Sequence, residues 1–239
     1  MSSISGVGTS PSVHVIPLTG LPEVQRGDDL AALLGDAIER AAGLEDGDVL
    51  VVAQKAVSKA EGRVEQTDDV VEAILREARA VRRRRGGLVI AETKHGFVCA
   101  SAGVDRSNAP GEGWIVLLPE DPDASAAGIR AALGDRFGHQ PTVIVSDSFG
   151  RAWRQGTTDV AIGVAGMRPL LDLRGEHDAR GYELSSTMIA VADELAGAAE
   201  LVMGKANGVP AAIVRGYTVP PGDGSAAELV MPPERDLFR

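Results

Sequence analysis

Two aspartates in this chain have neighbours that suit divalent-metal chemistry: Asp105 within AGVDRSN and Asp147 within VIVSDSFGR. The apolar, β-branched residues before Asp147 predict a buried strand, and the Ser-x-Gly-Arg after it predicts a turn opened by glycine. Hard cations such as Mg²⁺ and Mn²⁺ prefer carboxylate and hydroxyl oxygens and usually leave positions open for water or substrate phosphate. We therefore expect Asp105, Asp147 and Ser148 to supply the ligands of a metal and phosphate site.

Each aspartate also has a simpler interpretation. Taken alone, an aspartate in such a setting is often a turn or cap residue, because its side chain bonds to nearby backbone groups. The presence of two such aspartates favours the metal site. Zinc is not expected, since the chain has only 4 histidines, which are scattered, and no His-x-x-x-His pair.

Several polar side chains could bind the anionic part of a substrate. Arg151 and Arg154 follow the predicted turn, and a guanidinium group binds phosphate or carboxylate through two parallel hydrogen bonds. They could equally pair with acidic groups on the surface. Lys59 and Lys205 are candidate phosphate ligands, and Asn108 either contacts a base or ribose or shapes a turn before a proline.

The composition limits the possible partners. With 239 residues, 44% of them hydrophobic, the chain can bury a substantial core, and its formal charge is −10. Binding to nucleic acids or anionic membranes requires many cationic side chains against phosphates, so we expect neither. The sequence contains no Walker A motif and no Gly-x-Gly-x-x-Gly after a strand. Cations must therefore mediate any binding of a nucleotide.

The single cysteine, Cys99, lies in an apolar, strand-like run and is expected to be a buried structural thiol. It leaves no intrachain disulfide, which fits a reducing compartment. The first residues lack the basic start and apolar stretch of a signal peptide, and no apolar run approaches the roughly 20 residues of a spanning helix. We therefore expect a cytoplasmic protein without a membrane segment.

Hydrophobic periodicity predicts a chain with both helices and strands. Helices are expected at 30–41, capped by Asp28 or Asp29, from Thr67 or Asp68 to the arginine run 82–85, at 124–133 and at 184–202. Strands are expected at 13–18, 49–53, 88–92, 97–100, 114–118, 143–145, 160–165, 169–173 and 211–215. We interpret the arginine run as a solvated helix end, with a polyanion site as the alternative.

Four stretches of the chain resemble the signature of the coenzyme F420-0:L-glutamate ligase family. They are ETKHGFVCASAGVDRSN at 92–108, Leu117 and Pro119 with the Asp-Pro-Asp at 121–123, DSFGRAWRQG at 147–156, and the early LPE at 21–23 with GDDL at 27–30. Together with their surroundings they cover most of the chain, from about residue 16 to residue 217. A match over such long, ordered segments does not arise easily by chance.

The resemblance implies a GTP-dependent ligase that joins the amino group of L-glutamate to the lactyl-phosphate carboxylate of coenzyme F420-0 and extends the tail with γ-linked glutamates. It implies Mg²⁺ or Mn²⁺, with K⁺ as a further candidate ion, and GTP as the cosubstrate. The implied fold is α+β, with two interlocked subdomains and mixed sheets, assembled as a homodimer. A carboxylate does not react with an amine until its oxygen becomes a good leaving group. Phosphoryl transfer from GTP achieves this by forming an acyl phosphate, so no enzyme nucleophile is needed.

Carried over position by position, the resemblance assigns the metal ligands to Asp105, Asp147 and Ser148, the last in place of a threonine common in the family. With Arg151 and Arg154, the two aspartates form the expected catalytic group. The nucleotide contacts are assigned to Leu21, Pro22, Glu23, Val24, Gln54, Lys59 and Asn108, with Gly204 and Lys205 of the 203–210 loop as further candidates. At position 54, similar proteins often carry a hydroxyl residue.

For the domain organisation we expect a flexible tail at 1–12, a ligase domain of two subdomains at 13–218 and a linker-like segment at 219–239. Actinobacterial relatives often continue into a flavin-binding, nitroreductase-like domain, so the chain is either a standalone form or part of a longer protein. Two other functions stay open. One is a metal-dependent phosphohydrolase with water as the acceptor, and the other is a nucleotide- or metal-binding module without catalysis.

Overall fold

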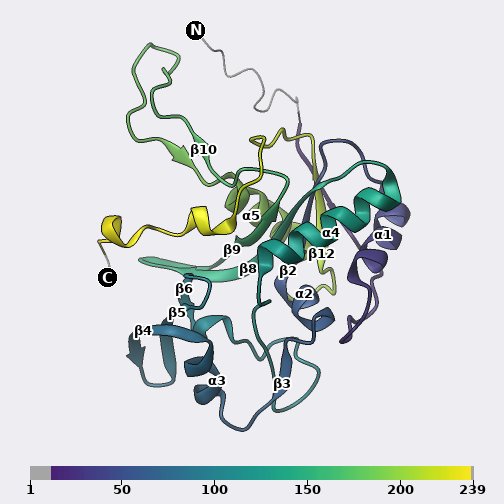
Figure 1. Cartoon of the computed structure of the whole chain (residues 1–239), viewed down its shortest axis with the longest axis vertical. Helices are drawn as coiled ribbons and strands as arrows, with labels where there is room; N and C mark the ends of the chain where they lie inside the picture. Colours follow the sequence, from purple (N-terminus) through teal and green to yellow (C-terminus); the bar gives the residue numbers. More distant parts are fainter. Residues whose placement is uncertain (1–11, 238–239) are drawn as a thin grey trace.

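The computed structural model describes residues 12–237, so the predicted tail at 1–12 lies outside the described residues except for Ser12 (Figure 1). The helices are α1 (Leu30–Ala41), α2 (Gln54–Ala60), α3 (Val70–Glu77), α4 (Pro122–Phe137) and α5 (Val191–Met203). Short 3₁₀ helices lie at Ser101–Gly103, Ala226–Leu229 and Pro233–Arg235. In the described part of the chain no helix is long and apolar enough to cross a membrane.

The strands are β1 (His14–Pro17), β2 (Val49–Ala53), β3 (Val64–Gln66), β4 (Ala78–Arg85), β5 (Leu88–Thr93), β6 (Val98–Ala100), β7 (Trp114–Val116), β8 (Thr142–Arg151), β9 (Arg154–Ala165), β10 (Leu171–Asp172), β11 (Met188–Ile189) and β12 (Ala211–Arg215). Five of them form the main sheet in the order β1-β12-β2-β8-β9. Its pairs are antiparallel except β2 with β8, which run parallel.

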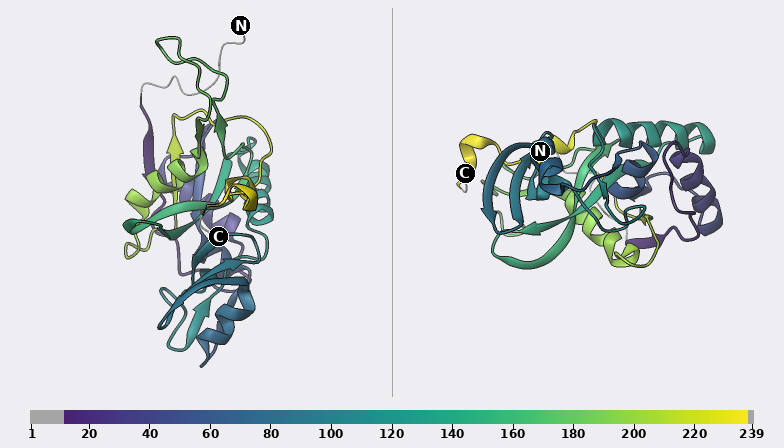
Figure 2. Two further views of the ribbon diagram at one scale, coloured as in Figure 1. Left: turned by 90° about the vertical axis from the view of Figure 1, so that its left-hand side faces the viewer. Right: turned by 90° about the horizontal axis from the view of Figure 1, so that it is seen from below.

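Helices cover both faces of the main sheet, as Figure 2 shows with α5 and α4 on opposite sides. Apolar residues alternate along the strands, so Leu50 and Val52 face α1 and α4, whereas Val49 and Val51 face α5. Burial on both faces explains why β2 and β8 are continuous apolar runs in the sequence. The layer of helix, sheet and helix therefore forms the larger part of the core.

A smaller lobe lies at the lower end of the molecule in Figure 1, between α2 and α4 in the sequence. It contains α3, the β3-β7 pair and the β4-β5-β6 sheet, packed around a separate apolar cluster that includes Ile74, Val89 and Ile115. The two cores and the segregated sheets confirm the expected α+β class. Gln54 and Ser58 join the parts, since both donate hydrogen bonds to the carbonyl oxygen of Leu117, at 2.9 and 2.7 Å.

Two outer segments extend from the body. The β10-β11 arm projects away from the sheet at the top of Figure 1. Residues 219–237, which the sequence suggested as a linker, lie against the body: Ser225 donates to Asp123 at 2.6 Å, and Ala226 is buried. The predicted boundary near residue 219 stays a prediction.

The interpretation of the arginine run as a helix end is wrong, because α3 ends at Glu77 and Arg82–Arg85 belong to strand β4. The segment forms a strand because it lies beside Glu92 of β5, whose side chain is only 6% exposed. Arg82 binds this carboxylate, and Arg79 lies 3.6 Å from it. A buried carboxylate requires such partners, and an extended strand beside β5 supplies them.

Two other boundaries were also predicted wrongly. The strand expected to end before Asp147 continues to Arg151 and pairs with β9 through Gly150↔Thr157, so the turn follows at Ala152 and Trp153. The helix expected from residue 184 begins at Val191, after the short strand β11. In both places tertiary pairing with another segment decides the structure, and such pairing leaves little local signal.

Gly163 on β9 has no space for a side chain, because a Cβ there would lie 2.3 Å from the backbone oxygen of Pro122 at the start of α4. We expect Gly163→Ala to lower the free energy of unfolding by about 1–3 kcal/mol, since α4 must shift. The matched control is Gly128→Ala in α4, where a Cβ meets nothing within 4 Å. It should stabilise the protein by about 0.5–1 kcal/mol. Urea unfolding of both variants tests this prediction, and equal midpoints would contradict it.

Candidate active site

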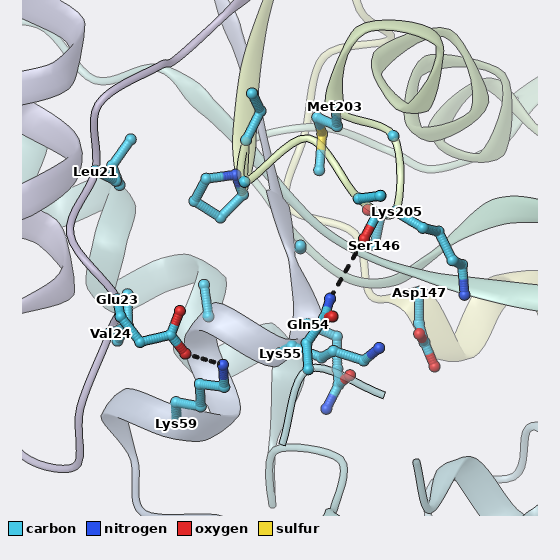
Figure 3. A pocket seen from close by; sticks show the side chains of 18 of the residues that line it. Leu21, Glu23, Val24, Gln54, Lys55, Lys59, Ser146, Asp147, Met203 and Lys205 are labelled. Carbon is cyan, nitrogen blue, oxygen red and sulfur yellow. Dashed lines mark hydrogen bonds and ion pairs between the residues drawn. The ribbon is translucent and has the colours of Figure 1, made fainter. Parts of the chain in front are cut away.

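A cavity of about 670 Å³ opens beside the end of β2 and the middle of β8, a size typical of small-molecule sites (Figure 3). The segments that surround it are 21–25, the first two turns of α2, the 108–110 loop of the smaller lobe, β8 and β9, and the loop 203–210 after α5. Every nucleotide-contact residue expected from the sequence lines this cavity: Leu21, Pro22, Glu23, Val24, Gln54, Lys59, Asn108, Gly204 and Lys205.

Parallel pairing of β2 with β8 brings two sets of polar residues together. Ala53 at the end of β2 lies opposite Ser146, so Lys55 in the first turn of α2 and Asp147, the next residue of β8, emerge at the same edge. Crevices at the carboxyl ends of parallel strands are the usual ligand sites of such sheets. The register therefore places a lysine and a carboxylate at the mouth of the cavity.

Asp105 lies next to this edge, behind Lys55, although it does not itself line the cavity. The ammonium of Lys55 lies 2.8 Å from Asp105 Oδ2 and 2.5 Å from Ser107 Oγ. Ser107 also donates its backbone N–H to Asp105 Oδ1 at 2.7 Å. Although burial opposes it, hydrogen bonds from Lys55 and Ser107 lower the pKa of Asp105 below its ordinary value.

Asp147 is in a different electrostatic state. Burial raises the pKa of Asp147 to about 7, and the charges of Asp105 and Asp159 add to the rise, while the Ser148 N–H and the Lys55 ammonium oppose it. Lys55 contacts Asp105 directly, and the charges of both groups act on the pKa of Asp147. Lys55 thus lies within reach of both aspartates that the sequence singled out, and their shared binding of a metal stays a prediction.

A second group of polar residues lies on the α5 side. The buried Asp159 of β9 accepts hydrogen bonds from Ser148 Oγ at 2.5 Å and from Ser146 Oγ at 3.0 Å. Glu200 also lines the cavity, where burial and the charge of Asp159 raise its pKa and Lys205 opposes the rise. This side of the cavity is rich in hydroxyl and carboxylate oxygens.

The opposite wall carries the expected nucleotide residues. Lys59, buried on α2, forms an ion pair with Glu23, as the dashed line in Figure 3 marks. Gln54 donates to Ser58 Oγ at 2.7 Å as well as to Leu117, so its amide nitrogen is committed within the protein. A ligand can therefore contact Gln54 through its side-chain carbonyl oxygen or through its backbone atoms.

Asn108 connects the two sides of the cavity. Its side-chain amide donates to the backbone oxygen of Lys205 at 3.5 Å, and its φ of 56° lies in the left-handed region that asparagine tolerates. Gly204, with φ 57°, ends α5 and directs the loop toward this contact. The contact explains how a loop of the smaller lobe and a loop 97 residues later in the chain enclose one space.

Arg151 and Arg154 are not brought to the cavity within this chain. They are exposed at the end of the β8-β9 hairpin, where Arg151 Nη2 lies 3.5 Å from the oxygen of Gln155. The neighbouring Trp153 is 81% exposed. Their expected place beside Asp147 depended on a turn that the continued strand replaces, and a catalytic role for them stays a prediction. Cys99 is buried as expected, and burial raises the pKa of its thiol to about 12, which leaves it unreactive.

The sequence assigned no definite role to four polar residues that line the cavity: Lys55, Ser146, Asp159 and Glu200. Lys55 carried a weak signal, since it follows the end of the β2 strand. Asp159 becomes visible only when β8 and β9 are recognised as a hairpin, because their register places it opposite Ser148. Glu200 belongs to an alanine-rich helix with no local sign of a site.

The donor set fits a hard divalent cation. In residues 12–237 no three His, Cys, Asp or Glu side chains are grouped closely enough to hold a metal ion by themselves. The carboxylate and hydroxyl oxygens of Asp105, Asp147 and Ser148 are nevertheless of the type that Mg²⁺ and Mn²⁺ prefer, and phosphate or water can complete such partial oxygen shells. The Lys55 ammonium bound to Asp105 shows that a positive charge is already favoured at this point.

Comparison with known proteins decides the family. A family model described as F420-0:Gamma-glutamyl ligase matches residues 20–216. This chain belongs to the F420-0:gamma-glutamyl ligase family. A protein of Methanothermobacter thermautotrophicus is 43% identical over 252 residues, which cover 95% of this chain and 99% of the relative. A protein of Methanopyrus kandleri is 41% identical over 257 residues, with 98% and 100% covered. Both relatives are named coenzyme F420:L-glutamate ligase.

The raised pKa of Asp147 predicts how the stability of the metal-free protein depends on pH. A carboxyl whose pKa is about 7 when folded and about 4 when unfolded binds more protons in the folded state between these values. Stability should therefore fall as the pH rises from about 4 to about 7, by at most about 4 kcal/mol. Asp147→Asn should remove this loss, so the variant should exceed the wild type in stability at pH 8 and not at pH 4.

Thermal unfolding in the presence of a chelator measures this effect. Asp135→Asn, at an exposed position of α4, is the matched control and should follow the wild-type pH dependence. An Asp147→Asn variant with the same pH dependence as the wild type would contradict the raised pKa.

Proposed function

We propose that this chain is a ligase that joins L-glutamate to the carboxylate of coenzyme F420-0, with GTP and Mg²⁺ or Mn²⁺, and that it extends the γ-linked tail. Family membership and the names of the relatives support the overall reaction. The observation that carries the chemical part is the position of Lys55 and Asp147 where the parallel pairing of β2 with β8 ends. Asp105 is bound to Lys55 there, beside a cavity lined by the expected nucleotide residues.

The charge of the cavity supports a cation-assisted reaction. Its lining residues include Lys55, Lys59 and Lys205, against the carboxylates of Glu23, Asp147, Asp159 and Glu200. Such a surface repels a nucleoside triphosphate unless further positive charge enters with it. A bound Mg²⁺ or Mn²⁺ would supply this charge and would neutralise the phosphate oxygens during transfer.

The reaction follows from the chemistry of amide formation. A carboxylate oxygen of F420-0 attacks the γ-phosphorus of GTP, the bond to the β-phosphate oxygen breaks, and an acyl phosphate and GDP result. The amino group of glutamate then attacks the acyl carbon, phosphate leaves with its bonding electron pair, and the amine loses a proton. Catalysis of this kind depends on positioning and charge compensation rather than on an enzyme nucleophile.

The side chains of the site have separate tasks in this proposal. In the structure Lys59 pairs with Glu23 and Lys55 pairs with Asp105. When the nucleotide binds, each ammonium turns one of its hydrogen bonds to a phosphate oxygen. Asp105, Asp147 and Ser148 hold the cation. Asn108 and the loop that carries Lys205 close over the nucleotide, which limits the access of water to the acyl phosphate.

Incubation of the protein with GTP, F420-0, glutamate and Mg²⁺ or Mn²⁺ tests the proposal, with products analysed by mass spectrometry. A ligase forms GDP together with glutamylated F420 in equal amounts during the first addition. A phosphohydrolase forms GDP without a glutamylated product, and a binding module forms neither. The last two outcomes would overturn the proposal.

A further inference from the structure

Asp159 is the most deeply buried carboxylate that lines the cavity, with 4% of its surface exposed. Its carboxylate oxygens accept hydrogen bonds from two hydroxyls: Ser148 Oγ binds Oδ1 and Ser146 Oγ binds Oδ2. A carboxylate so far from solvent is costly to keep charged unless its oxygens are bonded. The cost indicates a defined task for this residue.

The strand geometry fixes this arrangement. Ser146 and Ser148 are two residues apart on β8, so they project from the same face, and Asp159 lies directly opposite Ser148 on β9. Both serines line the cavity beside Asp147. The carboxylate therefore reaches both hydroxyls from the neighbouring strand, and both serines remain part of the cavity wall.

The direction of these hydrogen bonds has a chemical consequence. A serine hydroxyl has one proton to donate and two lone pairs. When Asp159 takes both protons, the Ser146 and Ser148 oxygens can offer only lone pairs to the cavity. Such oxygens attract a cation, and they cannot donate a hydrogen bond to a phosphate or carboxylate oxygen.

We propose that Asp159 is a positioning residue that holds the Ser146 and Ser148 hydroxyls as acceptors, so that Ser148 faces the cation with a lone pair and Ser146 provides an additional oxygen. This inference rests on the proposed function and deepens it, because it adds Ser146 and Asp159 to the cation site. Residues that orient metal ligands in this way typically change metal affinity by about 10- to 100-fold when they are substituted.

The test is Mn²⁺ binding to the full chain in the presence of GDP, measured by the electron paramagnetic resonance signal of free Mn²⁺, which needs no turnover. Asp159→Asn introduces an amide that donates to one serine and forces its proton toward the cavity. We expect the Mn²⁺ dissociation constant to rise about 10-fold or more. Asp193→Asn is the matched control, a half-buried aspartate that binds the neighbouring Ala161 N–H at 2.9 Å and does not line this cavity. It should leave Mn²⁺ affinity unchanged.

A double-mutant cycle separates positioning from a purely structural role. If Asp159 acts through Ser148, adding Asp159→Asn to Ser148→Ala should produce clearly less than the product of the two single effects. Fully multiplicative effects, or wild-type Mn²⁺ affinity in Asp159→Asn, would overturn the inference. Should Asp159→Asn fail to fold, Ser146→Ala gives the test, with a several-fold weaker Mn²⁺ affinity expected and an unchanged affinity contradicting it. Absence of glutamylated product with these Mn²⁺ effects intact would overturn only the proposed function.

Discussion

Asp147→Asn is expected to lower the rate of glutamate addition by about 1000-fold at saturating Mg²⁺ or Mn²⁺, which corresponds to about 4 kcal/mol of transition-state stabilisation. An amide is a much weaker ligand for a hard cation than a carboxylate. It also removes one of the negative charges that would attract the cation. The substitution keeps the size of the side chain, so the fold should be preserved.

The rate of GDP release and the yield of glutamylated F420 measure this effect. The exposed Asp135→Asn variant of α4 is the control and should keep wild-type rates. Because Asp147→Asn should also stabilise the metal-free protein at pH 8, a loss of activity without a loss of stability distinguishes a catalytic role from unfolding. Wild-type turnover in Asp147→Asn would remove this residue from the mechanism.

Lys55→Met should produce the second large effect, a rise of about 10- to 100-fold in the dissociation constant of GTP. The estimate follows from the loss of one charge-assisted hydrogen bond, worth about 1.5–3 kcal/mol. Lys55 lines the cavity, and its ammonium lies 2.8 Å from Asp105. Methionine keeps the apolar length of the side chain and removes only the charge.

Isothermal titration with GTP, or with a non-hydrolysable analogue, measures this affinity in the presence of Mg²⁺. Lys94→Met is the matched control, since Lys94 lies in the smaller lobe, pairs with Glu77 at 3.2 Å and does not line the cavity. It should leave the GTP affinity unchanged. Equal affinities of Lys55→Met and the wild type would show that this ammonium serves only to neutralise Asp105.

The sequence was most informative where local patterns coincide with burial. The β-branched run of β2, the capped helix α1 with Asp29 bonded to Ala32 N–H, and the apolar start of β8 were all predictable. The candidate residues Leu21 to Val24, Lys59, Asn108 and Lys205 do surround one cavity. Their grouping rested on family resemblance, because these residues lie far apart in the chain and share no spacing.

What could not be predicted depends on contacts between distant segments. β4 is a strand because its arginines bind the buried Glu92 of β5, and nothing within the run itself distinguishes it from a helix end. Asp159 enters the site only through the register of the β8-β9 hairpin. Arg151 and Arg154 illustrate the opposite case, since they are near Asp147 in sequence but at the far end of an extended hairpin in space.

The most direct test of the site is anomalous diffraction from crystals of the chain grown with Mn²⁺ and GDP. We predict an anomalous peak bound by Asp147 and Asp105, in contact with a phosphate oxygen of GDP, with the Lys55 ammonium moved from its present 2.8 Å contact with Asp105. A Mn²⁺ peak at any other place in the cavity, with Lys55 still bound to Asp105, would contradict the account.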